Sequence, residues 1–179
     1  LFRSWYRVDQ LRREVNRLEA GQATPGDFVS WVLEHACSFN AALGTWRRGS
    51  SVPAEYSHAL VTGETLRPRH LWQGKGGGIL PVFFDDNRQL GRGRSRKRVS
   101  DTVQWLRRAG QHLAILTNGR QWRLVFAGLD FDASCEWDVD LWFEEGIPGP
   151  QLEALRRLLH PKRFDPSGDD SPPLLEAIQ

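Results

Sequence analysis

The segment Ala114-Ile-Leu-Thr-Asn-Gly-Arg-Gln-Trp-Arg-Leu-Val-Phe126 decides the fold class, because it joins two apolar runs through Asn118-Gly119. Asn-Gly between two strand-like runs is typical of a tight β-hairpin, and it favours a type I′ turn. In the second run Trp122, Leu124 and Phe126 occur at every other position, as expected for one face of a strand. The segment therefore predicts two antiparallel strands with an apolar face.

The same reasoning predicts further elements on both sides of this hairpin. We expect helices over 3–20, 24–36, 99–106 and 151–160, a hairpin formed by 56–62 and 66–72, a buried strand over 79–84 and a strand over 135–143. Pro81 indicates that the strand 79–84 begins there or lies at an edge of the sheet. In the strand 135–143, Cys135 and Trp137 belong to the more apolar face. Residues 47–50, 74–78 and 88–98 are expected to be loops. The order of elements predicts an α/β (α+β) fold with a mixed β-sheet flanked by helices.

The chain divides into an N-terminal helix (1–23), an α/β domain (24–160) and a linker (161–179) rich in Pro, Asp and Ser. Because it begins with Leu1 and contains no methionine, we expect it to be a piece of a longer polypeptide. No apolar run approaches the ~20 residues of a membrane span, so we expect a soluble, cytoplasmic protein with no membrane partner. Cys37 and Cys135 are expected to be reduced packing residues, and the histidines show no metal-binding spacing.

Charge is unevenly distributed along the chain. Residues 1–123 carry 20 Lys/Arg and 10 Asp/Glu, whereas residues 124–179 carry 4 and 12. Residues 88–98 contain six basic side chains, those of Arg88, Arg92, Arg94, Arg96, Lys97 and Arg98. Such a loop suits contact with DNA phosphates, although it could also be simply solvated. Arg120 and Arg123 would extend the same surface, or would protect a strand edge from aggregation.

Asp85 and Asp86 follow the predicted strand 79–84, where paired carboxylates could hold Mg²⁺ for phosphodiester cleavage. Such a site normally needs a third ligand and a lysine that orients water. Asn87 and Arg88 come next instead, which favours a turn after the strand.

Three segments together resemble a known family: Leu66-Arg-Pro-Arg69, Pro81-Val-Phe-Phe-Asp-Asp-Asn87, and Thr102 to Arg108 continuing into Ala114 to Phe126. They are similar to the amino-terminal nuclease-like domain of type IIG restriction-modification enzymes and of the adenine methyltransferases of anti-phage systems such as DISARM and BREX. Such domains have a restriction-endonuclease-like, PD-(D/E)xK core. In that core an Arg-Pro-Asp precedes a strand ending in Glu-x-Lys, a helix with a glutamine, and a strand ending in Leu-Thr-Asn-Gly.

The resemblance places the family's metal-binding aspartate at Arg69, its glutamate at Asp85, its lysine at Asn87 and its helix glutamine at Gln104. An arginine repels a divalent cation and asparagine supplies no cationic donor, so these changes imply loss of cleavage. The resemblance thus implies a cleavage-inactive accessory domain that contacts double-stranded DNA or other subunits of a defence system. It implies no cofactor in this part of the chain, and S-adenosylmethionine in the methyltransferase of the full-length protein.

Two alternatives stay open. In one, the domain is an active endonuclease that binds Mg²⁺ through Asp85, Asp86 and either Glu34 or Glu55, with Lys97 in place of the missing lysine. In the other, it is a protein-docking module whose acidic strand 135–145 meets a basic partner.

Overall fold

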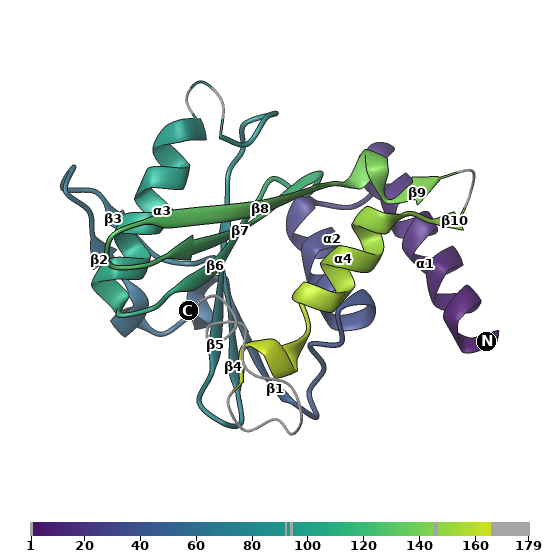
Figure 1. Cartoon of the computed structure of the whole chain (residues 1–179), viewed down its shortest axis with the longest axis horizontal. Coiled ribbons are helices and arrows are strands. Elements are labelled where there is room, and N and C mark those ends of the chain that lie inside the picture. Colours follow the sequence, from purple (N-terminus) through teal and green to yellow (C-terminus); the bar gives the residue numbers. More distant parts are fainter. Residues whose placement is uncertain (1, 92, 94, 145–146, 166–179) are drawn as a thin grey trace.

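A six-stranded mixed β-sheet forms the centre of the computed structural model, which describes residues 2–91, 93, 95–144 and 147–165 (Figure 1). Its strands are β1 (Gly44–Arg48), β4 (His70–Gly74), β5 (Ile79–Phe84), β6 (Leu113–Thr117), β7 (Gln121–Ala127) and β8 (Asp132–Asp138), in that order across the sheet. Only β5 and β6 are parallel, and helix α3 (Ser95–Ala109) connects them. The predicted mixed sheet flanked by helices is confirmed.

Helices cover both faces of the sheet. On one face α1 (Phe2–Glu19), α2 (Pro25–Trp31) and α4 (Pro150–Leu158) share a core with the strands, and α2 continues into a π-helical turn, Val32–Ala36. Trp122 and Leu124 of β7 belong to this core, as their alternation predicts. On the other face α3 packs against β6 and β7 through Trp105 and Leu106. None of the described helices is long and apolar enough to cross a membrane.

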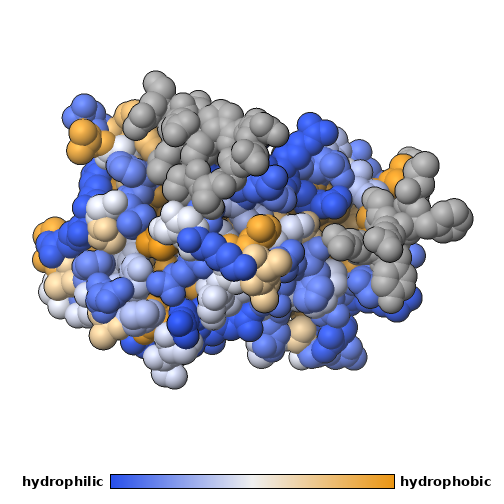
Figure 2. All heavy atoms as spheres, turned by 90° about the horizontal axis from the view of Figure 1, so that it is seen from below, coloured by the Kyte–Doolittle hydropathy of each residue, from blue (hydrophilic) through white to orange (hydrophobic). Residues whose placement is uncertain are grey.

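Short elements complete the described chain. They are the strand pairs β2 (His58–Ala59) with β3 (Thr65–Leu66) and β9 (Phe143–Glu144) with β10 (Ile147–Pro148), and 3₁₀ turns over Gly49–Ser51, Ala54–Tyr56, Val139–Leu141 and Pro161–Arg163. On the face drawn in Figure 2, most described residues are hydrophilic and the hydrophobic side chains form small separate groups.

The central hairpin is confirmed, but its turn is not of type I′. Asn118 pairs with Gln121 across a two-residue loop, and its Oδ1 accepts hydrogen bonds from the backbone N–H groups of Arg120 (3.1 Å) and Gln121 (2.7 Å). Gly119 has φ +93°, whereas Asn118 and Arg120 keep negative φ. Glycine at the first loop position is the type II′ pattern, so the side chain of Asn118 closes the turn and its backbone does not need to be strained.

Several strand predictions need correction. Residues 44–48, part of which was expected to be a loop, form the edge strand β1. The predicted hairpin 56–72 shrinks to β2 and β3, and His70–Gly74 joins the main sheet instead. Pro81 lies within the central strand β5, where it is tolerated because pairing with β6 begins only at Val82.

The predicted strand 135–143 ends at Asp138 and begins earlier, at Asp132. Trp137 is buried as expected, but Cys135 is exposed and is not a packing residue. The physical reason is that α4 covers the end of β8 that carries Trp137. The rest of this edge strand, including Cys135, is left to solvent.

The predicted glycine-rich loop 74–78 and the predicted arginine-rich loop 88–98 also differ from expectation. Helix α3 already begins at Ser95, so Arg96, Lys97 and Arg98 lie on its first turns and not in a loop. Gly74–Gly78 is a tight turn on which the chain after α4 is packed: Phe164 is buried in the core, and the Asp165 carboxylate accepts a hydrogen bond from Gly76 N (2.9 Å). The part of the predicted linker from Pro161 to Asp165 is thus packed against the domain, and 166–179 lies outside the described residues.

Candidate nucleic-acid interface

A surface pocket of about 660 Å³ lies where β5 and β6 end and α2 begins. Because β5 and β6 are parallel, their carboxyl ends meet at one edge of the sheet, and ligands of α/β sheets typically bind there. We call it the arginine pocket; its lining residues are Thr24, Pro25, Gly26, Arg69, Phe84, Asp85, Asp86, Asn87, Arg88, Asn118 and Arg120. Residues from four distant segments of the chain therefore converge on one site.

Three exposed arginines line this pocket. The guanidinium of Arg69 lies 5.1 Å from the centre of the Phe84 ring, a cation–π contact that leaves its N–H groups available. Within the described part of the chain the Arg88 side chain forms no hydrogen bond or ion pair, and its backbone carbonyl accepts a hydrogen bond from Asn118 Nδ2 (3.2 Å). Arg120 forms ion pairs with Asp140 and Glu19, both of them at the surface. Such pairs are weak in water, so a phosphate can compete for this arginine.

The two candidate catalytic carboxylates differ in their surroundings. Asp85 is 4% exposed and accepts hydrogen bonds from both the backbone N–H and the side-chain amide of Asn87. Asp86 is exposed at the pocket. The backbone carbonyl of Asn87 in turn accepts a hydrogen bond from Asn118 Nδ2 (2.9 Å). Asp85 and Asn87 therefore connect the turn after β5 to the turn of the β6–β7 hairpin.

The residues needed for the alternative nuclease do not assemble here. Glu34 forms an ion pair with Arg48, Lys97 forms one with Glu64 (2.8 Å), and neither these residues nor Glu55 line the pocket. Among the residues whose positions are described, no group of three or more His, Cys, Asp or Glu side chains is placed to hold a metal ion. Gln104, the match to the family's helix glutamine, accepts a hydrogen bond from Val61 N (3.1 Å).

A shallower pocket of about 590 Å³ continues the arginine pocket toward α3. The two share Asn87 and Arg88, and the second adds Gln89 and Gly93. Arg96 is exposed on the first turn of α3 beyond it, and Arg98 is half-buried. Hydrogen bonding to Glu64 raises the pKa of Lys97, so Lys97 stays protonated, and the Glu64 carboxylate offsets its positive charge. Arg92 and Arg94 lie outside the described residues.

Arg123 does not join this surface, contrary to the expectation that it lies beside Arg120. Its side chain is 14% exposed and forms an ion pair with Glu136. It also packs against Gly91, because a Cβ added to Gly91 would come within 2.4 Å of the Arg123 guanidinium. Burial lowers the pKa of Arg123. Arg123 therefore anchors the loop after β5, a structural role.

Two features of the site were missed in the sequence. Arg48 lies opposite His70 on the neighbouring strand, and His70 is buried with its Nδ1 2.8 Å from the carbonyl oxygen of Arg69. Burial lowers the pKa of His70, and the charges of Arg48 and Arg69 lower it further. No local pattern marks residues 44–48 as a strand, since Gly44 is the only buried residue among them, and the sequence therefore predicted a loop at Arg47-Arg48.

No family model, no curated protein and no solved structure matches this chain.

Proposed function

We propose that this chain is a DNA-contacting accessory domain of a restriction-modification or phage-defence adenine methyltransferase, and that it does not cleave DNA itself. The observation that carries this proposal is the convergence of Arg69, Arg88 and Arg120 on one pocket at the edge of the sheet. Arginine guanidinium groups match phosphate oxygens in geometry as well as in charge. The pocket continues toward Arg96, and this basic groove suits a phosphate backbone.

The order of elements supports a restriction-endonuclease-like core. In the resembling family, an Arg-Pro-Asp precedes a strand ending in Glu-x-Lys, and a helix with a glutamine and a strand ending in Leu-Thr-Asn-Gly come next. Here Arg69 precedes β5, α3 and β6, which follow one another in that order, with β4 between Arg69 and β5, and Arg69 and Asp85 line one pocket.

The chemistry of the pocket supports a binding role over cleavage. At the position of the family's metal-binding aspartate stands Arg69, whose positive charge opposes a divalent cation. At the position of the lysine stands Asn87, whose amide is occupied by Asp85. The arginines can hold a phosphate electrostatically, but among the described residues no set of carboxylates is placed to hold the metal ion that would activate water for cleavage. Under this proposal S-adenosylmethionine binds in the methyltransferase part of the full-length protein.

The test is the salt dependence of binding to a labelled DNA duplex, measured by fluorescence anisotropy. For B-DNA the slope of log K against log salt concentration changes by about 0.9 for each phosphate contact. The variant Arg69→Gln/Arg88→Gln/Arg120→Gln should therefore flatten the slope by up to about 2.7. The variant Arg13→Gln/Arg108→Gln/Arg157→Gln loses the same charge from exposed positions outside the pocket and serves as the matched control. Equal effects of the two variants, or wild-type binding with no salt slope, would refute the proposal.

Cleavage is tested separately with supercoiled plasmid and Mg²⁺. We expect no nicking by the wild-type chain. Nicking that disappears in Asp85→Ala would instead establish the endonuclease alternative.

A further inference from the structure

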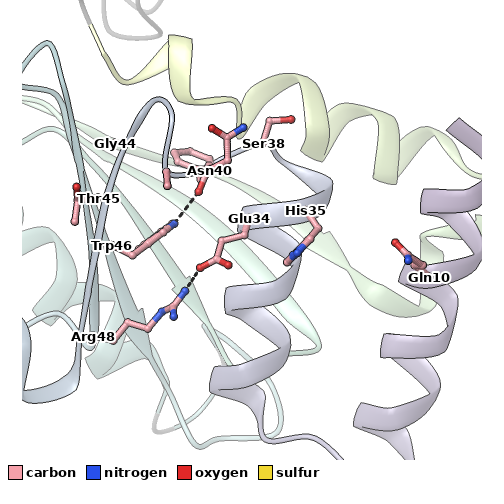
Figure 3. A pocket seen from close by; sticks show the side chains of 11 residues that line it. Gln10, Glu34, His35, Ser38, Asn40, Gly44, Thr45, Trp46 and Arg48 are labelled. Carbon is pink, nitrogen blue, oxygen red and sulfur yellow. Dashed lines mark hydrogen bonds and ion pairs between the residues drawn. The ribbon is translucent and has the colours of Figure 1, made fainter. Parts of the chain in front are cut away.

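A second pocket, of about 530 Å³, lies between α1, the π-helical turn and the edge strand β1 (Figure 3). Residues Ser38 to Ala41, from the loop before β1, close one side of it. Ser38 has φ +69° and is the only non-glycine residue with positive φ in the described part of the chain. Backbone in such a conformation is uncommon for serine and often marks a functional site.

Trp46 gives this pocket a fixed aromatic surface. The indole Nε1 donates a hydrogen bond to the carbonyl oxygen of Phe39 (3.0 Å), and the ring lies 5.9 Å from the Phe39 ring at a tilt of 56°. The side chain is only half-buried, so part of it faces the pocket. A ring already held in place loses little conformational freedom when a flat ligand stacks on it.

Hydrogen-bonding groups of both kinds surround this ring. Glu34 and Arg48 are paired across the pocket, as Figure 3 shows, and together offer acceptor oxygens and donor N–H groups side by side. The side-chain oxygen of Asn40 accepts from Ala42 N (3.1 Å), which leaves its amide N–H₂ as a donor. An aromatic surface beside mixed donors and acceptors suits a planar heterocycle with a polar edge, the description of a nucleobase.

Residues of the two pockets lie on either side of His70. Gly26 and Arg69 of the arginine pocket are next to this side chain, and Arg48 of the second pocket is its ladder partner on β1. A DNA strand carries its phosphate and its base on one nucleotide, so neighbouring phosphate-binding and base-binding pockets can be occupied by the same strand.

We propose that the second pocket binds an unpaired nucleobase of the DNA strand whose phosphates lie in the arginine pocket. This inference rests on the proposed function. It adds a substrate class: DNA with a mismatched, bulged or single-stranded base, since such a base costs least to unstack.

The experiment compares two labelled duplexes that are identical except at one bulged position, which holds adenine in one and an abasic site in the other. Wild-type protein should bind the adenine duplex about tenfold more tightly, the size expected for one base–aromatic stack. Trp46→Ala should abolish this preference and Trp46→Phe should retain most of it. Asn40→Ala, at an exposed position, should reduce it, and it removes only the hydrogen bond from Ala42 N besides. The salt slope should be the same for all of these proteins.

Equal binding of the two duplexes by wild-type protein overturns the inference, as does a preference that survives in both Trp46→Ala and Asn40→Ala. If either result occurs while the arginine triple variant still flattens the salt slope, the base pocket is wrong and the DNA-binding function stands. If the wild-type protein shows no salt-dependent binding at all, both proposals fail.

Discussion

Gly78 should be irreplaceable, because the chain after α4 passes directly over it. A Cβ added at Gly78 would lie 1.8 Å from the carbonyl oxygen of Phe164 and 2.8 Å from the Cα of Asp165. Both are backbone atoms, so no side-chain rotation can relieve the clash. The variant Gly78→Ala must therefore displace the segment that contains Phe164 and Asp165.

The cost follows from what this segment contributes. Phe164 is 8% exposed and packs against Phe39, and loss of such burial costs about 1.5–3 kcal/mol. The hydrogen bond from Gly76 N to the Asp165 carboxylate involves a charged group, and its loss costs about 1.5–3 kcal/mol more. We expect Gly78→Ala to lower the free energy of unfolding by about 3–6 kcal/mol.

Urea unfolding followed by circular dichroism measures this difference, and Gly77→Ala is the matched control. Gly77 has φ +91° but nothing within 4 Å of an added Cβ, so its substitution should cost only about 1–2 kcal/mol of backbone strain. If Gly78→Ala acts by displacing Phe164, then Phe164→Ala should add little to it in a double-mutant cycle. Additive effects, or equal losses in Gly78→Ala and Gly77→Ala, would refute the reasoning.

Three further predictions concern the arginine pocket and its support. Gly119→Ala should lower the free energy of unfolding, measured in urea, by about 1–3 kcal/mol. The loss should exceed that of Gly63→Ala, because both glycines have positive φ but only at Gly119 would the new Cβ meet a neighbour, Pro25 at 3.0 Å. Asp140→Asn should release Arg120 and tighten duplex binding about two- to fivefold, given that a surface ion pair is worth at most about 1 kcal/mol; an equal gain in Asp130→Asn would show that only overall charge matters. The lowered pKa of His70 means that the unfolded chain takes up a proton before the folded one, so stability should fall as the pH drops below the ordinary value of 6.5 toward the folded-state pKa. Urea midpoints at pH 7 and pH 5 should show this loss in the wild type and a smaller one in His70→Gln; identical losses would contradict it.

Local patterns were enough to predict the hairpin and the helices around it. The alternation of Trp122 and Leu124 and the place of the hairpin depend on neighbours within a few residues, and the structure keeps both, although the turn itself differs from the predicted type I′. The edge strand β1 could not be found in this way, since Gly44 is its only buried residue and its last two are exposed arginines. For Cys135 the pattern was present but misleading, because its burial depends on how far α4 reaches across the sheet.

Several residues of the site were predicted from the sequence. The charge pattern singled out Arg88 and Arg120, the resemblance matched Arg69, Asp85 and Asn87, and all five line the arginine pocket. The separation of Arg120 from Arg123 was not predictable, since Arg120 lies in the turn before β7 whereas Arg123 lies within β7, under the loop that follows β5. The place of Arg48 depends on the register of β1 against β4, which no local pattern contains.

The outer edge of β8 bears on how the protein behaves at high concentration. This strand pairs only with β7 among the described elements, and residues 132–136 are all exposed, so a second copy could in principle extend the sheet. Antiparallel pairing of two β8 strands centred on Cys135 would place Asp132 against Asp138 and Ser134 against Glu136, at both ends of the contact. Like charges facing each other across a ladder are destabilising. The acidic side chains of β8 thus disfavour edge-to-edge pairing of two molecules through this strand at neutral pH.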